Sequence, residues 1–193
     1  MSTQPPNNFP PGIEIDQETF QNWALAITVP NLWTCYPNSE DQVEQVCNWA
    51  AQQGYAVRPR GIMHGWSPTT VAADTPPDAK VILVDLTKYL KQITLIPATG
   101  SGTVSVQVQT GATMDDLLTY LQGAGGAGKP GYAFPHAPAP GHLTVGGVLA
   151  IDAHGSAIPS ENESFNCSYG SLSNQILSFK AVVTDPDSPT PNA

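Results

Sequence analysis

The segment from residue 58 to residue 68 reads Arg58-Pro59-Arg60-Gly61-Ile62-Met63-His64-Gly65-Trp66-Ser67-Pro68, and it follows a short run typical of a β-strand. Gly61 and Gly65 lack a Cβ, so backbone N–H groups in this loop can turn toward an anion and approach it closely. An ordinary surface loop, with Trp66 over the edge of the core, is the alternative interpretation of the same spacing. His64 is accordingly either a group that acts beside a bound anion or a polar surface residue.

The residues on either side of this loop predict a compact α/β unit. Ser39 has the position of a helix N-cap, Gln42 that of its capping-box partner, and Gly54 that of the glycine that ends the helix. Residues 55–58 predict a strand that runs into the loop, and residues 81–84 are wholly apolar, as in a buried strand. The loop should therefore lie at the carboxyl end of a strand, where open α/β sheets bind ligands.

The second half of the chain predicts antiparallel strands and one clear helix. Residues 93–97 and 103–110 have strand patterns and flank a glycine-containing turn at residues 98–102. Thr113 and Asp116 have the spacing of a capping box, which predicts a helix that begins there. The helix is expected to bury Leu117, Leu118 and Leu121.

These patterns divide the chain into an N-terminal arm and two subdomains. Residues 1–30 are predicted as an arm with a short amphipathic helix over residues 17–27, because apolar residues recur there at helical spacing. An α/β subdomain is expected at about residues 31–92 and an α+β subdomain at about residues 93–193. Residues 176–184 predict a last strand. Because no partner strand follows it, we expect the chain to be the front part of a longer protein.

A second candidate site is the stretch Leu143-Thr144-Val145-Gly146-Gly147-Val148-Leu149-Ala150-Ile151-Asp152-Ala153-His154-Gly155-Ser156. A glycine pair within an apolar segment indicates that another backbone or a ligand passes close by. His154, Gly155 and Ser156 can supply hydrogen bonds at the same place. A tightly packed hairpin or helix contact, with His154 satisfied internally, is the alternative, and the residues alone leave both interpretations open.

Composition argues against several classes of function. Among 193 residues, 7 basic and 16 acidic side chains give a formal charge of −9, so nucleic acid and anionic membrane surfaces are not expected partners. No apolar run reaches the ~20 residues that span a bilayer.

The 4 histidines and 3 cysteines match no metal-site template, so no metal is expected. Cys47 is expected to be a buried, small apolar residue of its helix. A G-x-G-x-x-G dinucleotide fingerprint is absent after the first strand.

Three motifs resemble the cofactor loops of the vanillyl-alcohol-oxidase-type (PCMH) flavoproteins. The pyrophosphate loop of that family is similar to Arg60-Gly61-Ile62-Met63-His64, and its second FAD element is similar to Gly111-Ala112-Thr113. Its third element resembles Thr144-Val145-Gly146-Gly147 together with His154-Gly155-Ser156 and Tyr169-Gly170-Ser171-Leu172-Ser173-Asn174. The resemblance runs from about residue 34 to residue 184. It implies an α+β fold, the two-subdomain FAD-binding domain of this type, incomplete at its C-terminus.

Within that family, the chain most resembles the bacterial type II cholesterol oxidases, which carry covalent FAD. Residues 9–23, 58–68 and 138–141 carry this likeness. It implies that His64 bonds to the flavin 8α-methyl group, for which a neutral imidazole nitrogen is a suitable nucleophile. The other cofactor-binding residues implied are Pro59, Arg60, Gly61, Ile62, Met63, Gly65, Gly111, Thr144, Gly146, Gly147, Ile151, His154 and Gly155. Met63 departs from the wider family, which commonly has glycine before the histidine.

The activity implied by this resemblance is oxidation of the 3β-hydroxyl of a sterol such as cholesterol, with O2 as acceptor, H2O2 as product and a double-bond isomerisation afterwards. An oxidase for another alcohol, such as a sugar or lactone, and a truncated FAD-binding module without turnover are the alternatives. The catalytic acid and base are expected beyond Ala193. Relatives are secreted bacterial enzymes, whereas this sequence opens without the basic and apolar regions of a signal peptide. Neither compartment nor oligomeric state is indicated.

Overall fold

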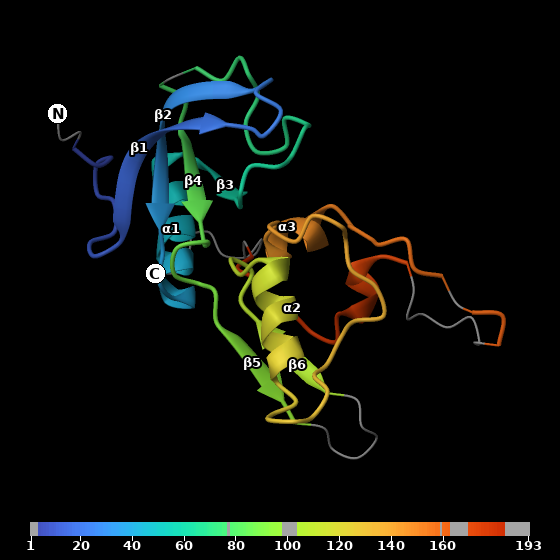
Figure 1. Cartoon of the computed structure of the whole chain (residues 1–193). Helices are drawn as coiled ribbons and strands as arrows, with labels where there is room; N and C mark the ends of the chain where they lie inside the picture. The colour runs from blue at the N-terminus through green and yellow to red at the C-terminus, as the bar shows by residue number, and fades with distance from the viewer. Residues whose placement is uncertain (1–3, 77, 98–103, 159, 163–169, 184–193) are drawn as a thin grey trace. The chain divides into compact units, whose positions relative to one another are not determined.

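The computed structural model describes residues 4–76, 78–97, 104–158, 160–162 and 170–183 (Figure 1). The chain divides into two compact units. The first unit runs from the N-terminal arm to Leu90 and includes the segment that begins at Lys180, and the second unit runs from Lys91 to Phe179. Each unit has a core of its own and is described separately.

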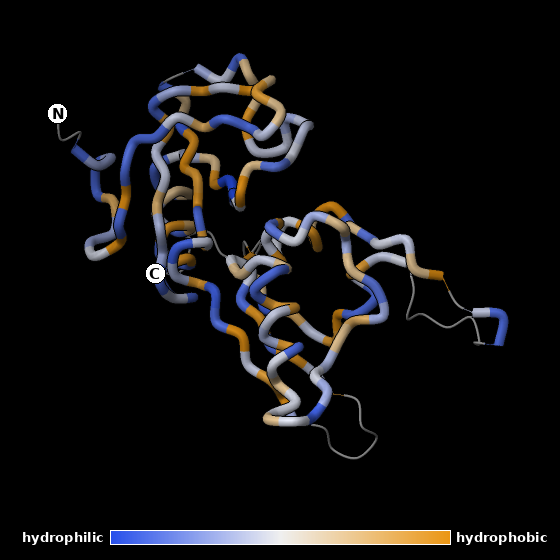
Figure 2. Tube along the Cα trace, viewed as in Figure 1, coloured by the Kyte–Doolittle hydropathy of each residue, from blue (hydrophilic) through white to orange (hydrophobic). Residues whose placement is uncertain are grey.

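A four-stranded mixed sheet in the order β1-β2-β4-β3 forms the first unit. β1 (Glu14–Gln21) pairs antiparallel with β2 (Thr28–Tyr36), whereas β4 (Val81–Asp85) pairs parallel with both β2 and β3 (Ala56–Arg60). Figure 2 shows β4 as a continuous apolar stretch. Parallel strands are usually buried on both faces, which explains why this strand does not alternate and confirms its prediction from sequence.

α1 (Glu40–Gln53) packs on this sheet, and both of its predicted ends are confirmed. The Ser39 hydroxyl accepts a hydrogen bond from the Gln42 N–H at 3.2 Å, and Gly54 ends the helix with a left-handed φ of 72°. The Gln42 side chain accepts from the Asn38 N–H at 2.8 Å. In a capping box it would accept from the N–H of the N-cap residue, Ser39, so the bond is made one residue before the predicted position. The core between helix and sheet is made by Cys35, Val46, Trp49, Ala50, Ile82 and Val84.

Residues 17–27 do not form a helix, contrary to the sequence-based prediction. β1 continues to Gln21, which lies opposite Thr28 of β2, and a turn joins the two strands. Phe20 and Ile27 are buried, but Trp23, on the same predicted helical face, is 58% exposed. β1 pairs with β2 from Glu14 to Gln21, with a register shift between Glu18 and Phe20, and this long-range hydrogen bonding outweighs the helical spacing of a few apolar residues.

The second unit combines a β-hairpin with short helices. β5 (Ile93–Ile96) pairs antiparallel with β6 (Ser105–Val108), as predicted, and α2 (Met114–Gly123), α3 (Val145–Ala150) and the 3₁₀ helix η1 (Leu172–Gln175) follow. The turn predicted at residues 98–102 lies outside the described residues. The buried core of this unit consists of Met114, Leu117, Leu121, Val145, Val148 and Leu172.

The capping box of α2 is confirmed in both directions. The Thr113 hydroxyl accepts from the Asp116 N–H, and the Asp116 carboxylate accepts from the Thr113 N–H, each at 3.0 Å. The hydrogen bonds from the Thr113 backbone and then from its hydroxyl lower the pKa of Asp116. Leu117 and Leu121 are buried, whereas Leu118 is only half-buried because it lies at the flank of the packed face.

Two further expectations are wrong. The described part of the predicted last strand, residues 176–183, forms no strand, and Leu177 and Phe179 are 83% and 82% exposed. An alternating segment becomes a strand only when a sheet edge pairs with it, and no strand among the described residues does so.

Cys47 is half-buried, because the buried stripe of α1 is centred on Trp49 and its neighbours. Of the helices within the described ranges, none is long and apolar enough to cross a bilayer.

Candidate functional site

The loop that follows β3 starts at the edge of the sheet where two parallel strands end. Arg60 closes β3 opposite Asp85, the last residue of β4, so the predicted position of the loop at the carboxyl ends of strands is confirmed. Gly61 and Gly65 have ordinary φ values, and it is Met63 that adopts a left-handed φ of 58°. The freedom of glycine is therefore not what shapes this loop. A Cβ added at Gly65 would meet no atom within 4 Å, which leaves its backbone accessible to a close neighbour.

A turn from much earlier in the chain holds His64 on both sides. The Trp23 N–H donates to the Met63 carbonyl at 2.8 Å, and the Asn22 side-chain amide donates to the Gly65 carbonyl at 3.1 Å. The His64 imidazole stacks on the Trp23 indole, with ring centroids 4.9 Å apart and planes 24° from parallel. His64 is half-buried, and its Nδ1 is buried. The role of Asn22 and Trp23 at this loop is not predicted from the sequence, because Asn22 and Gly65 are 43 positions apart.

Trp66 extends this aromatic stack. Its indole lies 5.8 Å from that of Trp23, with planes 23° from parallel. Trp66 is 68% exposed, so the interpretation in which it covers the edge of the core is wrong. The imidazole and the two indoles thus form one stack, and Trp66 is the more exposed of the two indoles.

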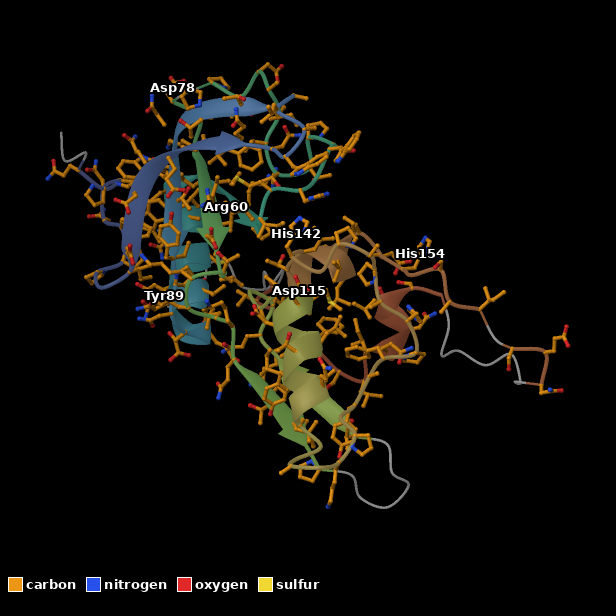
Figure 3. All side chains as sticks on the ribbon, in the orientation of Figure 1. Arg60, Asp78, Tyr89, Asp115, His142 and His154 are labelled. Carbon is orange, nitrogen blue, oxygen red and sulfur yellow. The ribbon has the colours of Figure 1, made fainter. Side chains whose placement is uncertain are left out.

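The Arg60 side chain is bound into the sheet beneath the loop (Figure 3). Its Nε donates to Asp85 at 2.9 Å, and its Nη1 donates to Glu18 at 2.8 Å. The Tyr36 hydroxyl donates to the same Glu18 carboxylate. Burial opposes the charge of Arg60, but the hydrogen bond with Asp85 and the charges of Asp85 and Glu18 together raise the Arg60 pKa. Any contact of Arg60 with an anion at the loop would therefore come from its backbone.

In the second unit, the segment that contains Gly111 lies directly against the start of α3. Thr113 and Thr144 form an isolated antiparallel bridge, and the Gly146 N–H donates to the Thr110 carbonyl at 3.0 Å. A Cβ added at Gly146 would lie 2.9 Å from the Thr110 Cβ, which is too close. The glycine pair predicts either another backbone or a ligand close by, and at Gly146 the neighbour is the backbone of Thr110.

Gly147 and Ile151 are exposed residues of α3 and of its C-terminal end. Thr144 caps this helix, because its hydroxyl accepts from the Gly147 N–H at 3.2 Å. Ile151 follows the helix and is 71% exposed. Asp152 then adopts a left-handed φ of 56°, which turns the chain toward His154.

His154 lies on the chain that follows α3 (Figure 3). Together with Gly155 it lines a hollow in the second unit. The His154 backbone bridges to Ser171, and its Nδ1 lies 2.9 Å from the Gly155 carbonyl oxygen. A Cβ at Gly155 would lie 2.5 Å from the Ala137 carbonyl oxygen, so the proline-rich loop packs directly on this glycine. The hollow has a volume of about 300 Å³ and is lined by Ala137, Ala139, His154, Gly155 and Ser156.

A small polar cluster fixes the chain that leads into this hollow. The Asp152 carboxylate accepts from the hydroxyls of Ser171 and Ser173, the second at 2.6 Å. The hydrogen bond from Ser171 and then that from Ser173 lower the pKa of Asp152. The segment that contains these serines is thereby hydrogen-bonded to Asp152, two residues before His154.

Comparisons with known proteins agree with this arrangement. The family described as FAD binding domain matches residues 32–187. A solvent-stable cholesterol oxidase is similar in structure with a TM-score of 0.80 and 44% sequence identity, over 90% of this chain and 31% of that one. A histidine-to-alanine mutant of the cholesterol oxidase from Brevibacterium sterolicum gives a TM-score of 0.77 and 36% identity, over 88% of this chain and 30% of that one. No curated protein matches the sequence.

The chain belongs to the FAD-binding domain family of the vanillyl-alcohol-oxidase type, and it is similar to bacterial cholesterol oxidases. The expected fold class is thus confirmed. The chain spans less than a third of the length of the cholesterol oxidases it matches, 31% and 30%. The family supports FAD as the cofactor.

The residues present fit such a cofactor. In the first unit a Cβ added at Gly65 would meet no atom within 4 Å, and the Arg60 side chain is bound to Asp85 and Glu18. In the second unit His136 is 6% exposed, and within the described part of the chain neither of its ring nitrogens has a hydrogen-bond partner. A buried imidazole is rarely left without a partner, and a bound cofactor or a water molecule can supply one. Ala137, which follows His136, lines the hollow beside Gly155.

Proposed function

We propose that this chain is the FAD-binding part of a flavin-dependent alcohol oxidase that acts on the 3β-hydroxyl of a sterol. The observation that carries the proposal is the 44% identity to a cholesterol oxidase over 90% of the chain. In the proposed reaction the alcohol loses two electrons and two hydrogens and becomes a ketone, and dioxygen takes them up as hydrogen peroxide. An isomerisation then moves the steroid double bond. FAD supplies the hydride acceptor, and the protein supplies position and electrostatics.

His64 carries the covalent part of the proposal. One of its imidazole nitrogens bonds to the flavin 8α carbon, and the imidazole N–H and one methyl C–H are lost. Dioxygen takes the two electrons and two protons released and becomes hydrogen peroxide, so the attachment is balanced. The stack on Trp23 and the bonds to Met63 and Gly65 support this role, because they hold the imidazole in one orientation.

Residues of both units contact the rest of the cofactor in this proposal. In the first unit the backbone N–H groups of Gly61, Ile62, Met63 and Gly65 bind the pyrophosphate, which is consistent with the open backbone at Gly65. In the second unit the residues implied by the resemblance line the remaining part. They are Gly111, Thr144, Gly146, Gly147, Ile151, His154 and Gly155.

Covalent attachment is tested on a denaturing gel. The purified full-length protein should be yellow, and its denatured band should fluoresce after an acid wash. His64→Ala should abolish that fluorescence, whereas His142→Ala, a substitution of an exposed histidine outside the proposed site, should leave it unchanged. A colourless wild-type protein would exclude the flavin proposal, and a fluorescent His64→Ala band would exclude His64 as the attachment residue.

The substrate is tested by the rate of peroxide release from the full-length protein. Cholesterol should be oxidised much faster than sugars and lactones at equal concentration. Faster oxidation of a sugar or lactone would favour the alternative oxidase on the same domain. Bound flavin with no turnover of any alcohol would favour a module that binds FAD without catalysis.

A further inference from the structure

We propose that the turn between β1 and β2, through Asn22 and Trp23, positions the His64 imidazole for flavin attachment. This inference rests on the covalent role proposed for His64. It assigns a task to two residues that none of the cofactor motifs includes. Asn22 and Trp23 act on His64 and not on the flavin, so they are positioning residues.

The backbone contacts fix the chain on both sides of the histidine. The carbonyl before His64, that of Met63, accepts from the Trp23 N–H at 2.8 Å, and the carbonyl after it, that of Gly65, accepts from the Asn22 amide at 3.1 Å. A left-handed φ of 58° is unfavourable for a methionine, so the loop needs such contacts to stay in this conformation. With both flanking peptides bound, the Cα–Cβ direction of His64 is set.

The aromatic contact then fixes the ring. The Trp23 indole covers one face of the imidazole at 4.9 Å and 24°, so the histidine is restrained about its side-chain torsions as well. The lone pair of an imidazole nitrogen lies in the plane of the ring. A bond to a methyl carbon must therefore form at the ring edge, which a partner stacked on the face does not cover. The stack thus orients the ring without blocking the reacting atom.

Asn22 makes the turn rigid enough for this task. It is 1% exposed, and its side-chain oxygen accepts from the Ile27 N–H at 2.9 Å while its amide reaches Gly65. Its backbone N–H donates to the Ile27 carbonyl at 3.0 Å, and its carbonyl accepts from Leu25 at 2.9 Å. One buried side chain therefore joins the turn to the loop. Phe20 and Ile27, on either side of the turn, belong to the buried core of the unit.

The rate of flavin attachment should depend on how precisely the imidazole nitrogen is placed against the methyl carbon. A misplacement of about 1 Å between reacting groups can lower a rate by about a hundredfold. Trp23→Leu keeps the backbone N–H that bonds to Met63 but removes the ring that orients the imidazole. We therefore expect attachment to slow at least about tenfold, with little change in the fold, because Trp23 is 58% exposed.

The test measures attachment itself. Full-length wild type, Trp23→Leu, Trp23→Phe and Trp66→Leu are made in a riboflavin-starved host, mixed with FAD, and sampled for acid-stable fluorescence on denaturing gels. Non-covalent FAD affinity is measured in the His64→Ala background. Trp23→Leu should attach flavin at least tenfold more slowly, whereas Trp23→Phe, which restores an aromatic face, and Trp66→Leu should stay within about threefold of wild type. Non-covalent affinity should not change with Trp23→Leu.

Several results would overturn the proposal. Wild-type attachment rates in Trp23→Leu would do so, as would equal slowing in Trp66→Leu, which would indicate a general effect of removing an exposed indole. Parallel loss of non-covalent affinity would mean that Trp23 only maintains the fold. If Trp23→Leu does not fold, Trp23→Met makes the same comparison with a flexible side chain. A wild-type protein without covalent flavin would instead refute the role of His64 on which the inference rests.

Discussion

Replacing Arg60 by methionine should loosen the sheet edge from which the His64 loop begins. The side chains of Arg60 and Asp85 are 10% and 5% exposed, and Arg60 also bonds to Glu18. Methionine keeps most of the apolar stem but leaves two carboxylates without their cation. Removing one partner of a buried pair costs about 3–5 kcal/mol. Because Glu18 is 34% exposed and water can solvate it, we expect the lower end, about 3 kcal/mol.

Hydrogen exchange in the full-length protein measures this loss where it occurs. Each 1.4 kcal/mol corresponds to about a tenfold change in an equilibrium constant, so about 3 kcal/mol should lower amide protection about a hundredfold. The effect should be found in peptides that cover β3 and β4, the two strands that end at Arg60 and Asp85. Peptides from α2, which belongs to the second unit, serve as an internal reference.

Lys180→Met is the matched control. Lys180 and Glu40 form an ion pair at 3.4 Å, but their side chains are 80% and 62% exposed. Exposed pairs contribute about 0–1 kcal/mol, so protection should fall by no more than a few-fold. If Arg60→Met changed the protection of β3 and β4 no more than Lys180→Met does, the argument that this ion pair holds the sheet edge would fail.

Two further predictions concern buried contacts. Burial raises the pKa of the Cys35 thiol from 9 to about 12, and burial also raises the pKa of half-buried Cys47, so at pH 8.5 native Cys35 should be alkylated more slowly than Cys47. The stability that the neutral Cys35 thiol provides should be lost only as pH rises from 9 toward 12. Equal labelling of both cysteines would contradict this. Gly146→Ala should destabilise by about 1–3 kcal/mol because its Cβ meets Thr110, whereas Gly65→Ala should stay within about 0.5 kcal/mol in thermal unfolding. The reverse order would refute the packing argument.

The features predicted correctly from sequence are those that depend on neighbouring residues. Helix caps at Ser39 and Thr113 are local hydrogen bonds, so three or four positions suffice to identify them. Residues 17–27 were misassigned because their helical spacing is local whereas their pairing with β2 is not. The contacts of Asn22 and Trp23 with the residues beside His64 likewise cannot be predicted from a short stretch of sequence, since Asn22 and Gly65 lie 43 positions apart. Nor does a glycine motif indicate that Met63 takes the left-handed conformation.

The hydrogen bonds from Asn22 and Trp23 also fix the direction of two backbone N–H groups beside His64. No peptide bond in the described part of the chain is cis, and in a planar trans peptide the N–H points opposite to the C=O. The Met63 and Gly65 carbonyls point toward the β1–β2 turn, where they accept hydrogen bonds. The N–H groups of the same two peptides, those of His64 and Trp66, must then point away from that turn. The hydrogen bonds that hold the histidine thereby fix the direction of two backbone donors that lie on either side of Gly65, whose own N–H is assigned to the pyrophosphate in the proposed site.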